Sequence, residues 1–343
     1  MMIKLTRRGF VAAAAATLAM PAIGRAQQTK LKLSHYLPPQ HQINTELNRW
    51  AGEVREKSGG AADIEVFPAG QMGPPPRQFD LARTGVSDIS FVFTALTPGR
   101  FPLVDALSIP FLFANENGDP ISTAEASRIA TSLKERTAQE FQGIDLLYAV
   151  VTTSGGWFMR DKLIKTPGDM KGLRIRPTSA AAAAQITALG ASPATIPPTE
   201  LADAIAKGVV DGAIFNFEGG KAFQLQQSVK KVSTLANSVG YFALVMNSDR
   251  LAGLPEEGRK AIVETTGPDA AARVGGLYDA AEVAGRKFME EAGVEVVDLR
   301  GDAANAFREA LQPVAEKQIA ELKAAGHDID GLIADIKAKM AEL

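Results

Sequence analysis

The stretch LKLSHYLPPQHQINTELNRWAGEVREKSGGAADIEVF, residues 31–67, contains a strand, a helix and a second strand in direct succession. Its first six residues alternate apolar and polar side chains and run into a proline-rich loop, as a strand before a turn does. Asn44 or Thr45 can cap a helix that ends near Gly59. The last five residues are again apolar at alternate positions. The stretch therefore predicts a strand–helix–strand unit.

The same alternation continues along the chain. Strands are expected at residues 89–93, 173–176, 195–196, 209–217 and 294–299, with helices at residues 256–267, 270–292 and 303–325. Strands that alternate with helices indicate an α/β fold with mostly parallel sheets covered on both faces. In such folds ligands bind at the carboxyl ends of the strands. This rule marks Tyr36 and Phe93 as candidates for a ligand cleft.

The N-terminus carries the features of an export signal. Arg7-Arg8 precede an apolar stretch at residues 11–20, and small residues follow at Gly24 and Ala26. This pattern is typical of a signal peptide, residues 1–26, and the arginine pair followed by Phe10 resembles the twin-arginine type. Ordinary secretion is the alternative, and it leads to the same compartment. We expect a periplasmic protein that is not inserted in the membrane after cleavage, because no later stretch has about 20 uncharged apolar residues.

Composition excludes several classes of site. The chain has no cysteine, so disulfides, thiolate metal sites and a lipid anchor on cysteine are excluded. The formal charge of −2 becomes −6 when the four basic residues of the signal segment are subtracted. With no basic block, a nucleic-acid partner is not expected.

Enzyme motifs are missing from the sequence. It contains no Gly-x-Ser-x-Gly, no phosphate-binding loop and no His-Glu-x-x-His, and its three histidines are scattered. A secreted enzyme would need a nucleophile and a base that the motifs do not supply. We therefore expect no catalytic residues.

Arg176 is the most informative polar residue. It stands at the end of a predicted strand, before a helix that Thr178 or Ser179 can cap. A guanidinium in this place can bind a carboxylate through two hydrogen bonds, and the free amides of the helix start add positive potential. A structural salt bridge to an acidic residue is the alternative, and spacing alone does not separate the two.

Several longer motifs occur in one order along most of the chain. They are FPAGQMG at residues 67–73, GVSD at 85–88, IPFLF at 109–113, PGDMKGLRIR at 167–176, LGASP at 189–193 and GVVDG at 208–212. In these motifs the chain resembles the periplasmic solute-binding subunits of tripartite ATP-independent periplasmic (TRAP) transporters. The resemblance implies a two-domain fold that closes over its ligand by a hinge, with a long helix at residues 270–292 spanning both domains. Domain I would comprise residues 27–152 and 242–283, and domain II residues 153–241 and 284–343.

The resemblance also implies roles for single residues. In this family the arginine that matches Arg176 binds the ligand carboxylate, and the cleft-lining positions fall on Tyr36, Phe93, Trp157 and Phe215. Family members that use a bound metal have a glutamate where this chain has Ile214, so neither a metal nor a cofactor is expected.

The expected ligand is a small organic acid, an aromatic or apolar monocarboxylate, delivered to the TRAP membrane subunits. A C4-dicarboxylate is the rival ligand, and its second charge would need Arg100 or Arg160.

The first prediction concerns processing. The exported protein should begin at Gln27, because Gly24 and Ala26 present small side chains to the signal peptidase. N-terminal sequencing of protein from the periplasmic fraction measures this directly. An uncleaved chain recovered only from the cytoplasm would contradict both the cleavage site and the export assignment.

Overall fold

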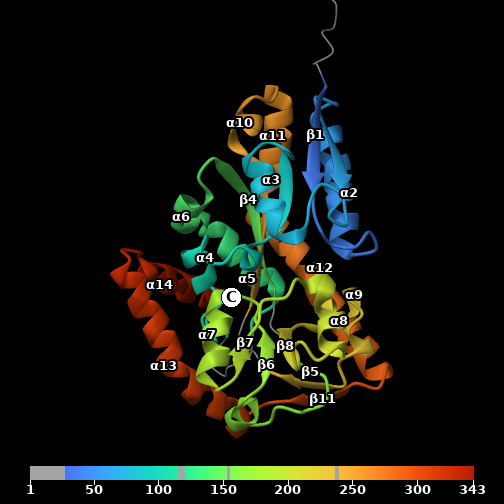
Figure 1. Ribbon diagram of the computed structural model, residues 1–343. Helices are drawn as coiled ribbons and strands as arrows, with labels where there is room; N and C mark the ends of the chain where they lie inside the picture. Colours follow the sequence, from blue (N-terminus) through green and yellow to red (C-terminus); the bar gives the residue numbers. More distant parts are fainter. Residues whose placement is uncertain (1–27, 115–119, 153–154, 236–238) are drawn as a thin grey trace, which may run out of the picture.

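The computed structural model describes residues 28–114, 120–152, 155–235 and 239–343, which form two lobes, each built on one mixed sheet (Figure 1). The expected α/β fold with two domains is confirmed. The predicted signal peptide and the cleavage site before Gln27 lie outside the described residues.

The first lobe contains a five-stranded sheet with the order β2-β1-β3-β10-β4. Its strands are β1 (Thr29–Ser34), β2 (Ala62–Phe67), β3 (Ile89–Phe93), β4 (Ile144–Thr152) and β10 (Gly240–Asn247). β1 pairs in parallel with β2 and β3, whereas β10 runs antiparallel to both β3 and β4.

The second lobe contains a six-stranded sheet with the order β11-β9-β5-β8-β6-β7. Its strands are β5 (Gly156–Met159), β6 (Arg174–Arg176), β7 (Ser192–Pro193), β8 (Gly212–Phe215), β9 (Lys231–Thr234) and β11 (Glu295–Asp298). Here β5 is the reversed strand, antiparallel to β8 and β9.

Each reversed strand is the first strand after the chain changes lobes. β4 ends in the first sheet and β5 begins in the second, while β9 ends in the second sheet and β10 begins in the first. β4 and β9 each have their carboxyl end at the boundary between the lobes. The next strand, β5 or β10, starts at that boundary in the other lobe, and it therefore runs away from the boundary, opposite to its neighbours. The crossings therefore place strand ends from both lobes around one space.

Helices cover both faces of each sheet, and four apolar cores result. In the first lobe α2 (Gln42–Lys57) and α11 (Glu256–Glu264) lie on one face, and α3 (Gln78–Arg83), α4 (Pro102–Ala106) and α5 (Thr123–Ser132) lie on the other. In the second lobe α7 (Ala180–Ala188) and α13 (Asp302–Ala324) oppose α8 (Leu201–Ala206) and α9 (Phe217–Ala222). The remaining helices are α6 (Lys134–Thr137), α10 (Ser248–Ala252), α12 (Pro268–Glu291) and α14 (Ile329–Met340).

Two local predictions were wrong. The cap of α2 is His41, whose Nδ1 accepts the Ile43 amide at 3.1 Å, instead of Asn44 or Thr45. The short strand expected at residues 195–196 lies three residues earlier, at Ser192–Pro193, where Ser192 pairs with Arg174. A helix start and a two-residue strand depend on tertiary partners more than on local pattern.

The long helix α12 is fixed to both lobes through their helix starts. Asp279 accepts the amides of Thr123 and Ala124 at 2.8 and 3.1 Å, at the start of α5 in the first lobe. One turn further, Glu282 accepts the amides of Phe217 and Glu218 at 2.9 and 2.8 Å, at the start of α9 in the second lobe. Carboxylates at helix starts satisfy amides that have no partner within the helix. Because α12 holds both lobes, it can set how they are placed relative to each other.

The C-terminal helix bears on the domain boundaries. The apolar side chains of α14, Ile329, Leu332 and Ile336, are buried in the core between the first sheet and α5. We therefore propose that α14 belongs with domain I. This differs from the predicted domain II, which includes residues 284–343. The other boundaries stay predictions, and β10 of the first sheet begins at Gly240, two residues before the predicted boundary at 242.

The second prediction tests the close approach of α12 to α5. A Cβ at Gly275 would lie 2.6 Å from the Thr123 carbonyl oxygen, whereas a Cβ at the neighbouring Gly276 would meet nothing within 4 Å. Gly275→Ala should lower the free energy of unfolding by about 1–3 kcal/mol through overpacking. Gly276→Ala is the matched control and should raise it by up to about 1 kcal/mol through helix propensity. Urea unfolding of both variants measures the difference, and equal effects would show that the helices are not in close contact.

Candidate functional site

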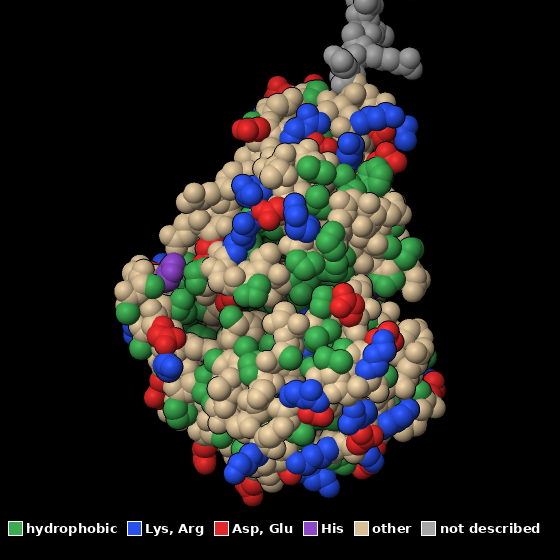
Figure 2. Space-filling model, viewed as in Figure 1, with side chains coloured by type: hydrophobic (Ala, Val, Ile, Leu, Met, Phe, Trp, Pro, Cys, Tyr) green, Lys and Arg blue, Asp and Glu red, His purple; other side chains and the backbone are tan. Residues whose placement is uncertain are grey.

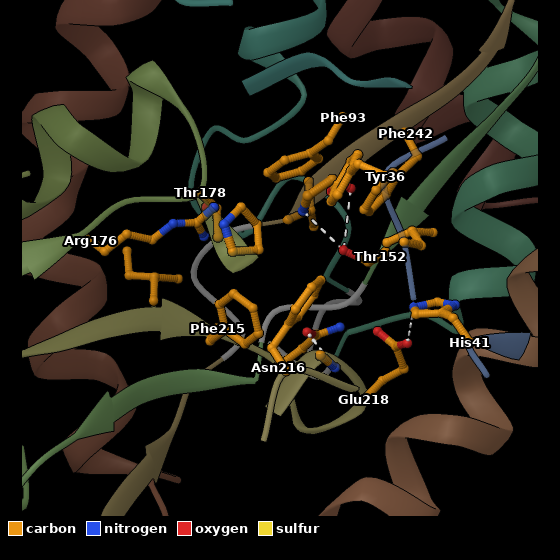
Figure 3. A pocket seen from close by; sticks show the side chains of 17 residues that line it. Tyr36, His41, Phe93, Thr152, Arg176, Thr178, Phe215, Asn216, Glu218 and Phe242 are labelled. Carbon is orange, nitrogen blue, oxygen red and sulfur yellow. Dashed lines mark hydrogen bonds and ion pairs between the residues drawn. The ribbon is translucent and has the colours of Figure 1, made fainter. Parts of the chain in front are cut away.

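A cavity lies between the lobes, at the strand ends that the two crossings bring together (Figure 3). Its volume is about 50 Å³. The first lobe supplies Tyr36, Leu37, His41, Phe93, Thr152, Val239, Gly240 and Phe242, and the second lobe supplies Arg176, Thr178, Pro198, Ile214, Phe215, Asn216, Glu218, Gly219 and Phe223. On the face seen in Figure 2, apolar side chains gather at the waist where the lobes meet.

Arg176 is the last residue of β6 and points from the second sheet into this cavity. Pro177 follows it, and the Ser179 side chain accepts the Ala182 amide at 3.0 Å to start α7. The Arg176 side chain is only 2% exposed, and its Nε donates to the Ile196 carbonyl oxygen at 3.1 Å. The Ile196 carbonyl thus holds Nε of the guanidinium, and the two terminal nitrogens lie toward the cavity.

The guanidinium has no acidic partner among the described residues. Burial lowers the pKa of Arg176 to about 10, and the opposing influence comes only from Tyr36. Its nearest rings are those of Phe215 and Phe93, with centroids 5.4 and 5.9 Å from the central carbon. At neutral pH the cavity therefore contains a desolvated positive charge, which is costly unless an anion pairs with it.

Aromatic side chains form the walls around Arg176. Of the residues predicted to line the cleft, Tyr36, Phe93 and Phe215 do so. Phe242 was not predicted, and its ring stacks on Phe93 with centroids 4.7 Å apart. Phe242 lies on β10, and no motif or periodicity in the sequence places this strand next to the cleft. Burial also raises the pKa of Tyr36 beyond its ordinary range, so its hydroxyl remains a hydrogen-bond donor.

Trp157 does not line the cavity, and that expectation is corrected. Its side chain is fully buried in the core with Ile175 and Phe307, and it is not among the residues that line the cavity. Side chains alternate along a strand, and Trp157 falls on the face that packs against α7 and α13. Its role is therefore to fill the core of the second lobe.

The end of the cavity away from Arg176 is polar, and the sequence did not predict it (Figure 3). Glu218, in the first turn of α9, accepts from His41 Nε2 at 2.8 Å and from Gln42 Nε2 at 2.7 Å. These bonds join the second lobe to the first. Asn216 caps α9 by accepting the Gly219 amide at 3.2 Å, and an asparagine before an acidic first turn is a signal that could have located this helix start.

Arg100 and Arg160, the candidates for binding a second ligand carboxylate, both have acidic partners. Arg100 pairs with Asp80 at 3.0 Å and Arg160 with Asp161 at 2.7 Å, and neither lines the cavity. Within the described ranges no three His, Asp or Glu side chains converge in a way that could hold a metal ion. In that same part of the chain, no helix is long and apolar enough to span a bilayer.

Comparison with known proteins adds independent information. A model of the family described as bacterial extracellular solute-binding protein, family 7, matches residues 33–322. A marine metagenome TRAP solute-binding protein specific for aromatic acid ligands, in complex with metahydroxyphenylacetate, is 26% identical, with a TM-score of 0.85 and coverage of 92% of this chain and 99% of its own. A TRAP periplasmic solute-binding protein of Bordetella bronchiseptica with bound (R)- and (S)-mandelate is 28% identical, with a TM-score of 0.82 and coverage of 92% and 99%.

Two curated relatives complete the comparison. The C4-dicarboxylate-binding periplasmic protein of Rhodobacter capsulatus is 25% identical over 354 residues, which cover 98% of this chain and all of that protein. The match to an uncharacterized protein of Sinorhizobium fredii, 27% identical over 263 residues, spans only 47% of that protein's length.

The third prediction concerns pH. Burial raises the pKa of Glu282 to about 7, although the two amides it accepts act in the opposite direction. The folded protein therefore binds a proton that the unfolded chain releases near pH 4.5, and this contribution to stability is lost as the pH rises toward 7. Glu282→Gln should make the decline of the unfolding free energy between pH 4.5 and 7.5 shallower by on the order of 1–3 kcal/mol.

Urea unfolding at several pH values measures this slope. Asp105, whose pKa burial also raises to about 7, provides the matched control. Asp105→Asn should flatten the slope independently, and additive effects are expected in the double variant. An unchanged slope in Glu282→Gln would contradict the prediction.

Proposed function

The chain belongs to family 7 of the bacterial extracellular solute-binding proteins and is a TRAP solute-binding protein, and we propose that it captures an aromatic or apolar monocarboxylate. It would deliver this ligand to TRAP membrane subunits from the periplasm, after export by a twin-arginine signal. The family consists of solute-binding proteins, so capture and release of unchanged ligand is the proposed activity.

The observation that carries the proposal is the buried guanidinium that has no acidic partner among the described residues. Arg176 faces the cavity with its terminal nitrogens, and no acidic side chain of the described residues neutralises it. A ligand carboxylate would accept two hydrogen bonds there and neutralise the charge. This arrangement favours the binding role of Arg176 over the structural salt bridge.

The rest of the cavity favours one negative charge and a flat apolar body. Aromatic rings can gain stacking contacts and buried area against Phe93, Phe215 and Phe242. The second carboxylate of a C4-dicarboxylate would have no second arginine and would approach Glu218 instead. The marine and Bordetella proteins, whose ligands are aromatic acids, support the same choice.

The fourth prediction tests the anchor. Arg176→Met should weaken monocarboxylate binding by roughly 30- to 5,000-fold, which corresponds to about 2–5 kcal/mol. The unfolding free energy of the ligand-free variant should be unchanged or higher, since an unpaired buried charge has been removed. Calorimetry and urea unfolding give the two quantities. Retained affinity together with a large loss of stability would show that Arg176 is structural.

The fifth prediction ranks ligands. In thermal-shift measurements at equal concentration, benzoate and mandelate should stabilise the protein more than succinate or malate, because stabilisation grows with ligand concentration relative to Kd. Phe215→Asn should weaken the aromatic acids most. Trp157→Phe is the control, since Trp157 lies outside the cavity, and it should leave the ranking unchanged. A ranking led by succinate or malate would overturn the choice of aromatic ligand.

A further inference from the structure

We propose that Glu218 recognises a hydroxyl group on the ligand, so that the preferred ligand is a hydroxylated aromatic monocarboxylate held at both ends. The inference rests on the proposed function, because it assumes that the carboxylate binds Arg176. Its evidence is separate and comes from the opposite end of the cavity.

The two oxygens of Glu218 have different surroundings. Oε1 accepts from both His41 and Gln42 across the lobe boundary. For Oε2 no hydrogen-bond donor is found among the described residues, although the residue is only 6% exposed and lines the cavity. Oε2 is therefore an acceptor that a donor on a ligand would stabilise, and the cavity is where such a donor can be placed.

Among the described residues no lysine or arginine pairs with this carboxylate. His41 Nδ1 accepts the Ile43 amide at 3.1 Å, so that nitrogen carries a lone pair. Its proton lies on Nε2 and is donated to Glu218, as is one proton of the Gln42 amide. The polar end of the cavity therefore accepts hydrogen bonds and repels a second anionic group.

The other side-chain acceptors of the described residues at this end have partners. Asn216 Oδ1 accepts the Gly219 amide, and Thr152 Oγ1 accepts the Gly240 amide at 3.2 Å and donates to the Gly240 carbonyl at 3.4 Å. Among these residues Glu218 Oε2 is left as an open acceptor oxygen, and a hydroxyl can donate its single proton to it. An ammonium group has three protons, more than the two lone pairs of this oxygen can accept.

The test is a calorimetric comparison of matched ligands with the full mature chain. Benzoate is compared with 2-, 3- and 4-hydroxybenzoate, and phenylacetate with 3-hydroxyphenylacetate, on wild type and on Glu218→Gln. In the variant the amide must keep its oxygen toward His41 and Gln42, which turns its NH2 group toward the cavity. We expect at least one hydroxylated acid to bind wild type about tenfold or more tightly than its parent, and this preference to be lost in Glu218→Gln.

Gln42→Ala is the matched control. It removes one bond between the lobes but leaves the open oxygen of Glu218 in place, so both ligands of a pair should weaken equally and the preference should persist. Glu218→Ala provides a second variant if Glu218→Gln does not fold.

The outcomes separate this inference from the function on which it rests. If wild type binds benzoate and hydroxylation gives no gain, or if Glu218→Gln keeps the gain, the role of Glu218 is wrong and the proposed function survives. If no aromatic acid binds, both fail. Tighter binding of 4-(aminomethyl)benzoate than of every hydroxylated acid would overturn the assignment of a hydroxyl.

Discussion

The burial of the Arg176 guanidinium at the boundary between two lobes is the constraint on which the site depends. A positive charge with no acidic partner among the described residues is unfavourable in an apolar cavity. The surrounding structure maintains it through the short strand β6, the bond to the Ile196 carbonyl and the helix start that follows. In the proposed function an anion from outside the chain pairs with this charge, and both lobes contribute residues around it.

The two reversed strands and α12 explain why the lobes meet at this charge. The crossings from β4 to β5 and from β9 to β10 each begin a strand that runs away from the boundary, so strand ends from both sheets surround the cavity. On the far side of the lobes, Asp279 and Glu282 tie one helix to the starts of α5 and α9. Because α9 also carries Glu218, the carboxylate that contacts the first lobe is positioned by the same helix that links the lobes.

The cavity is electrostatically asymmetric, and in the proposed function this asymmetry gives the specificity. Among the described residues, the arginine at one end has no acidic partner, and the carboxylate at the other end has no lysine or arginine partner. Aromatic rings lie between the two groups. A ligand with one carboxylate, a flat body and a hydrogen-bond donor at its other end satisfies each of these regions, whereas a dicarboxylate satisfies only one.

The sequence by itself determined the α/β class, the positions of the long helices and the family resemblance, because these depend on local periodicity and on motifs that are contiguous in the chain. It singled out Arg176 as a candidate binding residue. It also indicated Tyr36, Phe93 and Phe215, which stand at strand ends. Only the tertiary structure decided that Trp157 is enclosed in a core, although Ile214, its neighbour across the sheet, lines the cavity. The same holds for Glu218 and His41, which lie 177 residues apart in numbering (218 − 41) and meet only because the lobes close on each other. This site is defined by burial and by a charge without an acidic partner among the described residues. Both properties arise from packing between segments that are distant in the chain, so a sequence pattern cannot show them.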